Sequence, residues 1–490
     1  MDSQHTENLK VWKSFVSIFI EERLRWFYIV LFFSIVIFIF ILLNFGWIPS
    51  LIFSFLPLTI YFIIKFIEKP LYAYLCVFVI NYFIMGLTRY VPSIPAGIII
   101  DILLTFTFFL LIIYSKKHTL QIKDVINPLT LFTVIWLIYC LILLFNPYTN
   151  INNWAAGVRA LALYFFVFPI LTVLLMNQYK YLKVFLFVWS ILTILAVVKS
   201  LVQKFIGFDS AELYWLNVTG GRRTHIIYSG VRFFSFFTDA ASFGCNMGMS
   251  MIVFLLAGFF IQSKTLRIYY IIVSLLAGYA MMISGTRAAI YVPFVGFAFF
   301  LILSKQWKIM IPGVVIILAL FVFFKFTYIG HGNADIRRMR SALNITQDAS
   351  YKVRQQNQIL MKEFMKEHPF GVGIGEAKRA EPGDYLYKLP TDSSIVLIWV
   401  ETGVVGLSIF LLIFLVTFIK GFFDIWFTIK DKELRGLLSA LLGGVAGMLV
   451  SSYGNEMLQQ FPNGPIVYMC MAFIFMGPKL DKEISENEIT

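Results

Sequence analysis

Residues 389–407, LPTDSSIVLIWVETGVVGL, put Asp392 and Glu401 at the entrance of a long apolar segment. A charged side chain inside a bilayer is costly, and it commonly marks a site or a pathway. The segment continues without further charge to residue 419, which is long enough to cross about 30 Å of hydrocarbon. The stretch therefore predicts a membrane-spanning helix whose first turns are polar. The function of these polar residues depends on which side of the membrane they face.

The composition extends this prediction to the whole chain. The 490 residues are 59% hydrophobic and 14% charged, whereas soluble domains average about 25% charged residues. Apolar runs near 20 residues recur throughout, which predicts an all-α polytopic membrane protein forming a single membrane domain over 1–490. We expect about 14 spans (12 to 14), at 26–45, 48–66, 71–88, 96–114, 128–145, 156–176, 183–203, 238–261, 268–284, 288–304, 309–328, 394–419, 436–452 and 463–477.

The charges of the short loops predict the orientation. Loops such as SKKHTLQIK, MNQYKYLK and IKDKELR carry lysines, whereas the alternate short loops carry only Arg89. Cytoplasmic loops are enriched in Lys and Arg, so we expect both termini in the cytoplasm. Two long segments, 204–237 and 329–393, then lie outside, the second as the larger extracytoplasmic subdomain between the spans near 328 and 394.

Charged residues gather at the outer ends of the predicted spans, which indicates an outward-facing polar cavity. Besides Asp392 and Glu401, they are Asp101, Arg159, Asp239 and Arg287. Alternative interpretations stay open for several of them. Asp101 and Arg159 could simply pair within the bundle, and Glu401 lies deeper than Asp392, which favours a structural role over that of a base.

Several functional classes are disfavoured by the sequence. The net charge of +13 is explained by cytoplasmic anchoring charge and an anionic ligand, so no nucleic-acid partner is expected. There is no CxxC or HExxH motif, so we expect no metal and no cofactor. The four cysteines all fall in apolar runs: Cys76, Cys140, Cys245 and Cys470.

Three arginines lie in segments that could meet at this cavity. Arg232 precedes Asp239 in GVRFFSFFTDAASFG, Arg287 is in the turn ISGTRAAI, and Arg354 is in a predicted helix ahead of HPFGVGIGEAKR. The planar guanidinium group binds phosphate oxygens bidentately, and fixed cations can stabilise a departing pyrophosphate. Asp392 could accept the proton of an attacking sugar hydroxyl. Turn anchoring of Arg287 and solvation of the other two are the alternatives.

The 329–393 segment carries further patterns. Its helix is predicted to place Val353, Leu360, Met361 and Phe364 on one face, lying on the membrane surface or capping a cavity. The arginines at 337, 338 and 340 are expected to form a surface patch. The glycines of GVGIG follow a helix, not a strand, so we interpret them as a turn that lets backbones approach closely.

Over roughly residues 220–420 these motifs resemble the O-antigen ligase and polymerase superfamily, the Wzy-type membrane proteins of bacterial surface-polysaccharide assembly. The resemblance rests on VRFFSFFTDAASFG, SGTRAA, the Arg354-to-HPFGVGIG loop and TDSSIVLIWVETGVVGL. It implies a GT-C-like, metal-independent, inverting glycosyltransferase of the bacterial cytoplasmic membrane, acting on its outer face. The donor would be an undecaprenyl-pyrophosphate-linked oligosaccharide. Membrane lipids, a chain-length regulator and a flippase would be its partners.

Carried onto this chain, the resemblance implies that Arg232, Arg287 and Arg354 bind the pyrophosphate. Asp392, Arg287 and Arg354 are the candidate catalytic residues, and Asp239, Glu401, Arg159 and Asp101 are supporting residues. Ligases of the superfamily often have a His-Asn pair where this chain has Thr391 and Asp392, so a repeat-unit polymerase is favoured. A ligase acting on a lipid A-core or other acceptor is the alternative. A flippase or other transporter is less favoured because transporters place their charges near the midplane.

Overall fold

The computed structural model describes residue 34, residues 36–38, 40, 42–44, 46–227, 230–304, 307–342 and 349–380, residue 382 and residues 384–489. The chain divides into two compact units. The first comprises Met1–Tyr72 with Leu110–Tyr114, and the second comprises Ala73–Phe109 with Ser115–Thr490. All candidate site residues belong to the second unit.

The first unit contains helix α2 (Trp47–Glu68), which matches the predicted span at 48–66. Gly46 precedes it with φ of +86°, a left-handed conformation that glycine adopts without steric cost. The predicted first span at 26–45 lies mostly outside the described residues.

The remaining described chain is almost entirely helical, as the apolar runs predict. The spanning and connecting helices up to the first long loop are α3 (Pro70–Tyr90), α4 (Ala96–Ser115), η1 (Ile122–Val125), α5 (Pro128–Ile142), η2 (Leu143–Phe145), α6 (Ile151–Val158), η3 (Arg159–Leu163), α7 (Tyr164–Leu175) and α8 (Tyr179–Phe205). Those that follow are α11 (Ala240–Phe260), α12 (Lys264–Ile283), η4 (Arg287–Ile290), α13 (Tyr291–Leu303), α14 (Trp307–Phe326), α17 (Ser394–Phe423), η7 (Asp424–Thr428), α18 (Lys432–Ser451) and α19 (Asn463–Ile489).

Within the described part of the chain, nine helices are long and apolar enough to cross a membrane, by length and composition. Each corresponds to a predicted span, and two shorter apolar helices, Arg287–Leu303 and Met310–Phe326, correspond to two more. The class of a mostly helical, multi-pass protein is therefore confirmed, whereas the count of fourteen is not.

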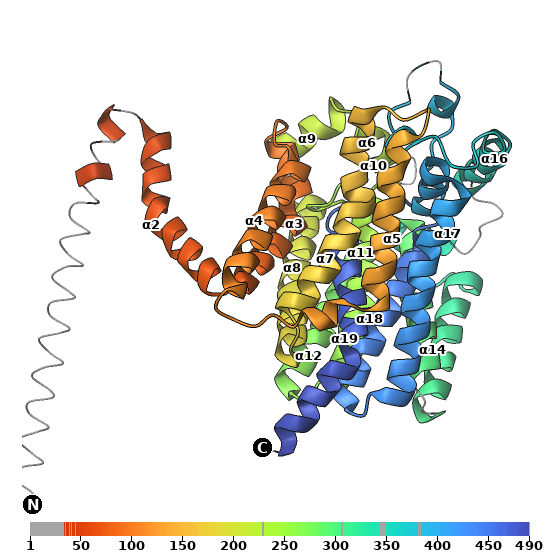
Figure 1. Ribbon diagram of the computed structural model, residues 1–490. Helices are drawn as coiled ribbons and strands as arrows, with labels where there is room; N and C mark the ends of the chain where they lie inside the picture. Colours follow the sequence, from red (N-terminus) through yellow and green to blue (C-terminus); the bar gives the residue numbers. More distant parts are fainter. Residues whose placement is uncertain are drawn as a thin grey trace, which may run out of the picture. The chain divides into compact units, whose positions relative to one another are not determined.

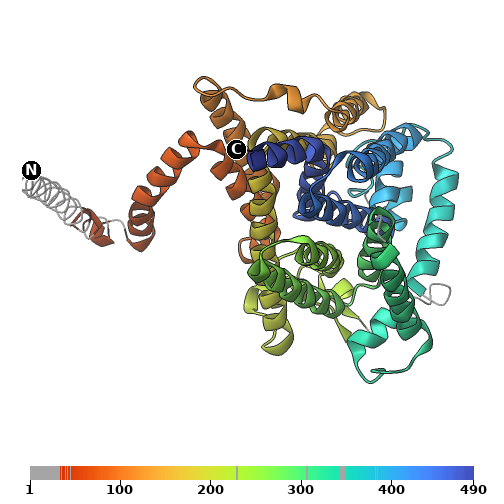
Figure 2. The same ribbon diagram turned by 90° about the horizontal axis from the view of Figure 1, so that it is seen from below.

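Helix α18 forms the centre of the second unit, where it packs against α11, α13 and α19 (Figure 2). Its sequence is rich in small residues, and a Cβ atom on Gly447 would lie 2.3 Å from the carbonyl oxygen of Val292 on α13. A Cβ atom on Gly443 would lie 2.7 Å from the carbonyl oxygen of Gly296. Small residues four apart let two helix backbones approach closely, so this spacing explains the tight crossing of α13 and α18.

Both long connections lie at the same end of the second unit, opposite the carboxyl terminus (Figure 1). The first connection folds into α9 (Ser210–Asn217), α10 (Arg222–His225) and two short antiparallel strands, β1 (Ile226–Ile227) and β2 (Gly230–Val231), paired Ile226 to Val231. The second contains α15 (Ala334–Ser341), α16 (Ala349–Phe364) and η6 (Tyr385–Lys388).

A break in α17 connects the second loop to the bundle. Gly403 has φ of +69° inside the helix, and a Cβ atom there would lie 2.2 Å from the carbonyl oxygen of Pro369. The loop then pairs with the helix backbone, because Val372 donates to the carbonyl of Val400 at 2.9 Å and Val404 donates to Pro369 at 3.1 Å. The close approach predicted for the GVGIG glycines is confirmed.

Candidate active site

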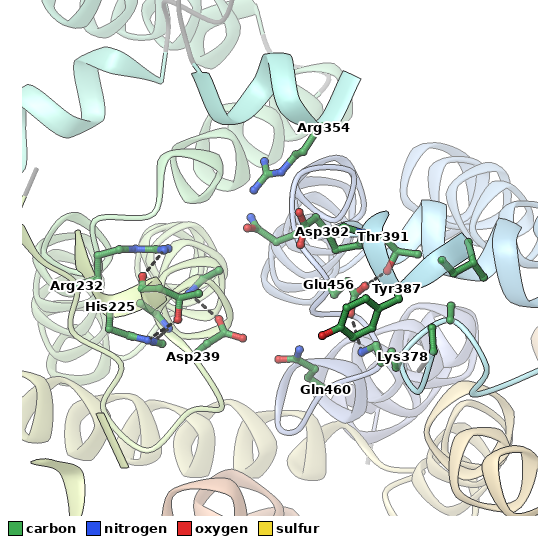
Figure 3. A pocket seen from close by; sticks show the side chains of 18 residues that line it. His225, Arg232, Asp239, Arg354, Lys378, Tyr387, Thr391, Asp392, Glu456 and Gln460 are labelled. Carbon is green, nitrogen blue, oxygen red and sulfur yellow. Dashed lines mark hydrogen bonds and ion pairs between the residues drawn. The ribbon is translucent and has the colours of Figure 1, made fainter. Parts of the chain in front are cut away.

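Two cavities at this end of the second unit share Arg354. The larger has a volume of about 680 Å³, and Arg232, Asp239 and Asp392 are among its lining residues (Figure 3). The smaller has a volume of about 450 Å³ and is lined by Arg287 together with Tyr291, Gln358 and Tyr453. Four charged residues predicted from three separate segments, Arg232 with Asp239, Arg354 and Asp392, thus line the larger cavity, and Arg287 lines its neighbour.

Arg232 forms one wall of the larger cavity. Its guanidinium group donates to the hydroxyl of Thr286 at 2.8 Å and to the carbonyl of Thr224 at 3.0 Å. Burial lowers the pKa of Arg232, and the Asp239 carboxylate opposes that change. Thr286 belongs to the predicted SGTRAA turn, so this hydrogen bond links two of the motifs directly.

Further cations lie near Arg232. Arg338, Arg287 and Arg354 are close enough that their charges further lower the pKa of Arg232. An arginine remains protonated in proteins even so. The mutual repulsion of these guanidinium groups would be relieved by a bound anion, which makes this wall a candidate phosphate site.

Asp239 has a structural task as well as a place in the cavity. It is the N-cap of α11, and its Oδ1 accepts hydrogen bonds from the amides of Ala241 at 2.7 Å and Ser242 at 2.8 Å. A carboxylate at this position also interacts favourably with the helix dipole. The supporting role predicted for Asp239 is compatible with this geometry.

His225 lines the same side of the cavity as Arg232 (Figure 3) and was not among the predicted residues. Its Nε2 accepts a hydrogen bond from the amide of Ala240 at 3.1 Å, so Nδ1 carries the proton and donates to the carbonyl of Gly221 at 2.9 Å. Burial lowers the pKa of His225 to about 4. The neutral ring therefore connects α10 to the start of α11 and holds the Arg232 wall in place.

Arg354 extends from α16 toward the larger cavity (Figure 3). Among the described residues its guanidinium group has no hydrogen-bond partner, although its charge opposes the rise in the pKa of Asp392. Neighbouring Gln355 and Gln358 line the smaller cavity. Helix α16, which was predicted to lie on the membrane surface or cap a cavity, therefore borders both cavities.

Asp392 lies on the opposite wall in a strained conformation. Its φ of +46° is rare for a residue with a Cβ atom, and such strain persists where the surroundings impose it, often at functional sites. Burial raises the pKa of Asp392, the charge of Arg354 opposes this, and the charge of Glu456 adds to it. A carboxyl group with a raised pKa accepts a proton more readily than an ordinary aspartate does.

The residues around Asp392 are held by Glu456. The Thr391 hydroxyl donates to one carboxylate oxygen of Glu456, and Lys378 forms an ion pair with the other at 2.6 Å. Ser394 donates its amide to the carbonyl of Ser452 at 3.0 Å, which joins the start of α17 to the end of α18. The loop carrying Asp392 is thus fixed from two sides.

Glu401 is buried under the 369–375 loop and lines neither cavity. The amide of Gly373 donates to its backbone carbonyl at 3.2 Å. This position supports the structural interpretation of Glu401.

Asp101 and Arg159 form an ion pair at 2.6 Å, so the prediction that they could pair within the bundle is confirmed. Tyr164 also donates to Asp101 at 2.6 Å. Neither charged residue lines either cavity. The ion pair therefore joins α4 to the start of η3.

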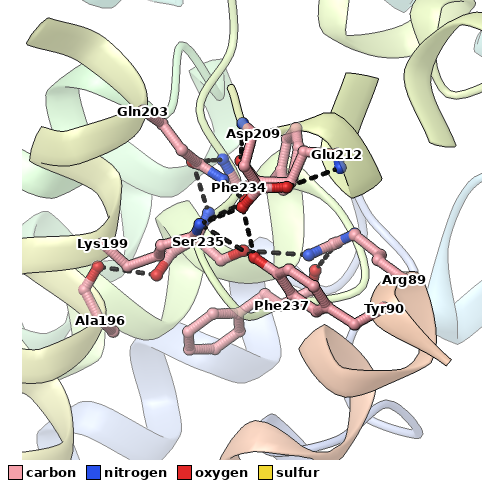
Figure 4. Close-up of polar contacts among 10 residues, drawn as sticks. All are labelled: Arg89, Tyr90, Ala196, Lys199, Gln203, Asp209, Glu212, Phe234, Ser235 and Phe237. Atoms are coloured by element: carbon pink, nitrogen blue, oxygen red, sulfur yellow. Dashed lines mark hydrogen bonds and ion pairs between the residues drawn. The ribbon is translucent and has the colours of Figure 1, made fainter. Parts of the chain in front are cut away.

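A buried network holds the segment between Arg232 and Asp239 (Figure 4). The Arg89 guanidinium group donates to the carbonyl oxygens of Ser235, Phe237 and Thr238. It also lies over the Trp215 ring, 4.6 Å from its centroid. Gln203 accepts from the amide of Ser235 at 2.9 Å, which helps keep Ser235 at its φ of +51°.

One prediction about the second loop is wrong, and another is only partly correct. Arg338 and Arg340 are buried, not part of a surface patch: Arg338 donates to the carbonyl of Val231 at 2.8 Å, and Arg340 donates to backbone carbonyls near Thr327. The predicted apolar face of α16 is only half correct. Met361 is buried in a small core, whereas Val353 and Leu360 are exposed.

Sequence reasoning missed several polar residues that line the larger cavity, among them His225, Lys378, Tyr387, Glu456 and Gln460. They lie in loops whose local patterns resemble ordinary polar surface. Among the described residues, no group of three or more His, Cys, Asp or Glu side chains is placed to hold a metal ion.

The fold and these cavities define a multi-pass helical protein with a cation-rich site facing a strained carboxylate. Residues 272–411 match the family model described as O-antigen ligase, Wzy_C. The match includes Arg287, Arg354 and Asp392, and it is consistent with the O-antigen ligase and polymerase superfamily that the motifs resemble. A comparison with curated proteins gives no match.

Proposed function

We propose that the chain is a membrane glycosyltransferase that polymerises oligosaccharide repeat units carried on undecaprenyl pyrophosphate. The observation that carries this proposal is that Arg232, Arg354 and Asp392 line one cavity of about 680 Å³. Cations able to hold a diphosphate and a carboxylate able to accept a proton thereby meet in a space large enough for saccharide. The match of residues 272–411 to the O-antigen ligase family supports a glycan-transferring reaction.

The proposed reaction assigns a role to each wall. Arg232 and Arg354, with Arg287 from the adjoining cavity, hold the donor diphosphate and stabilise its charge as it departs. Asp392 accepts the proton of the acceptor hydroxyl as that oxygen forms its bond to the anomeric carbon. The bond from the anomeric carbon to the diphosphate breaks, and undecaprenyl pyrophosphate leaves. Attack from the face opposite the leaving group inverts the anomeric centre, and no metal is required.

The proposal includes a cellular setting. The enzyme is placed in the bacterial cytoplasmic membrane as a GT-C-like protein of 12 to 14 spans, with both termini in the cytoplasm and the cavities on the outer face. Lysine-rich loops on one side support this orientation. A flippase that delivers the donor and a regulator of chain length are the proposed partners.

A ligase that transfers the glycan to a lipid A-core or other acceptor is the second candidate. The same cavity would serve it, and the family match fits either reaction. Thr391 and Asp392, in place of the His-Asn pair frequent in ligases, favour the polymerase. A transporter is disfavoured because Arg232, Arg287 and Arg354 lie in connections or at a helix start, not in the middle of a spanning helix.

The purified chain should distinguish these candidates when it is incubated with an undecaprenyl-pyrophosphate oligosaccharide and no added metal. A ladder of lengthening products supports a polymerase. A single transfer that occurs only when lipid A-core is added supports a ligase. Absence of transfer in both reactions contradicts the proposal and favours a transporter instead.

A further inference from the structure

The two walls of the larger cavity differ in chemistry. The wall that contains Arg232 has further arginines near it, since the charges of Arg338, Arg287 and Arg354 act on Arg232 in addition to the burial that lowers its pKa. On the opposite wall the one lysine, Lys378, is neutralised by its ion pair with Glu456 at 2.6 Å. The remaining groups there are amides, hydroxyls and carboxyls, which do not attract a phosphate but do hydrogen-bond neutral hydroxyl-rich ligands.

Glu456 makes this second wall rigid. One of its carboxylate oxygens accepts from Thr391 and the other pairs with Lys378. Since the Glu456 side chain is only 17% exposed, both of these interactions are largely shielded from solvent. Asp392 follows Thr391 directly, so Glu456 also fixes the position of the proposed base relative to this wall.

Gln460 has hydrogen-bonding capacity that the protein does not use. It lines the cavity and points toward its interior (Figure 3), yet its Oε1 is buried without a partner among the described residues. A buried acceptor without a partner is costly. The last torsion of a glutamine side chain is soft, so the amide can turn to bind a ligand hydroxyl from the cavity.

Tyr387 adds an aromatic surface to the same wall. Its side chain projects into the cavity on the same side as Gln460 (Figure 3), and the residue is 55% exposed. A tyrosine combines an apolar ring with a polar hydroxyl. That combination suits the face of a sugar ring, whose C–H groups pack on the aromatic ring while its hydroxyls reach the polar groups nearby.

From these observations, and resting on the proposed function, we infer that the wall formed by Lys378, Tyr387, Glu456 and Gln460 is the acceptor subsite. It binds the non-phosphorylated end of a saccharide chain and presents one hydroxyl to Asp392. Gln460 and Tyr387 are the main contacts, and Glu456 with Lys378 keeps the wall in shape. The donor diphosphate is held on the opposite wall by different residues.

The test is a binding measurement that does not require turnover. The full chain in lipid nanodiscs is titrated with a phosphate-free oligosaccharide, released by mild acid from the surface polysaccharide of cells that express it. Gln460→Leu should weaken this binding about three- to tenfold, the loss expected for one hydrogen bond. Tyr387→Ala should weaken it at least as much, whereas Arg232→Ala should leave it within twofold.

Gln459 provides a matched control. It is the same residue type next in the chain, its amide atoms are also buried without partners in the described part, and it does not line the cavity. Gln459→Leu should bind the oligosaccharide as the wild type does. Unchanged binding by both Gln460→Leu and Tyr387→Ala would overturn the assignment, and so would loss of binding in Arg232→Ala alone.

A kinetic measurement separates this inference from the proposed function. In the transfer reaction, Gln460→Leu should raise KM for the acceptor and leave KM for the lipid-linked donor unchanged. If the wild type transfers sugar but Gln460→Leu raises only KM for the donor, the acceptor subsite is wrong and the proposed function stands. If the wild type binds the oligosaccharide but transfers none to any acceptor, the proposed function fails instead.

Discussion

Arg354 and Asp392 face the same cavity from separate elements, and the charge of Arg354 opposes the rise in the pKa of Asp392 that burial causes. Arg354 comes from α16 in the second loop, and Asp392 immediately precedes α17. A cation that can hold a diphosphate is thus placed beside a carboxylate that can accept a proton. This relationship determines most of the expected effects of substitution.

Replacing Arg354 or Arg287 by alanine should abolish the product while the protein remains folded and inserted. Removing one preorganised group that stabilises a leaving anion costs about 10²- to 10³-fold in rate. Product formation by the purified variants, together with their yield in the membrane fraction, checks this. Lys362→Ala is the control, since Lys362 is exposed on α16 and lines neither cavity. Wild-type product lengths from Arg354→Ala would contradict the assignment.

The pH dependence of the transfer rate should report the protonation of Asp392. Because a base must be deprotonated and burial raises the pKa of Asp392, activity should fall at a higher pH than for an ordinary aspartate as the solution is acidified. The charge of Glu456 contributes to the rise, so Glu456→Gln should shift this acid limb to lower pH. Rates measured across pH for both proteins check it. An acid limb that stays in place or moves upward in Glu456→Gln would contradict it.

Asp392→Asn should lose activity and gain stability. A carboxyl group whose pKa is higher in the folded than in the unfolded state favours folding at low pH, and this contribution is lost as pH rises through the folded pKa. At neutral pH the buried carboxylate is therefore destabilising relative to the neutral amide, and asparagine also tolerates the φ of +46°. Thermal unfolding in detergent at pH 7 and pH 4 should show a higher Tm for Asp392→Asn, mainly at pH 7. A lower Tm at pH 7 would refute this account of the strain.

Gly403→Ala should destabilise the protein and disturb the site. Alanine would be strained at φ of +69°, and its Cβ atom would lie 2.2 Å from the carbonyl of Pro369. Backbone strain of this kind costs about 1–3 kcal/mol, and displacement of the loop would change the position of α16 with Arg354. Gly332→Ala, where a Cβ atom meets nothing within 4 Å, is the matched control in thermal unfolding. Equal Tm values for the two variants would show that the loop contact at Gly403 is unimportant.

Much of the fold follows from local sequence because spanning helices depend on length and apolar composition. The predicted span at 71–88 corresponds to α3 at Pro70–Tyr90, and the one at 436–452 corresponds to α18 at Lys432–Ser451. The pairing of Asp101 with Arg159 could be anticipated because an intramembrane charge needs a partner. These predictions concern properties that a single segment carries within itself.

The site was predictable only in part. Arg232, Arg354 and Asp392 were expected together and line one cavity, whereas Arg287 lines the adjoining one. Glu456 and Gln460 come from the short connection between α18 and α19, where nothing local distinguishes polar residues of a site from polar residues of a surface. Arg338 was misplaced because its hydrogen-bond acceptor, the carbonyl of Val231, is about a hundred positions away in the chain.

The central claim is that the arginine wall binds the lipid-linked diphosphate and that Asp392 accepts the proton during transfer. The most direct measurement is a single-turnover reaction of the purified chain with a radiolabelled undecaprenyl-pyrophosphate oligosaccharide and excess acceptor. We predict rapid release of undecaprenyl pyrophosphate by the wild type, loss of donor binding in Arg232→Ala and Arg354→Ala, and normal donor binding without release in Asp392→Asn. Wild-type release rates in all three variants would contradict the account.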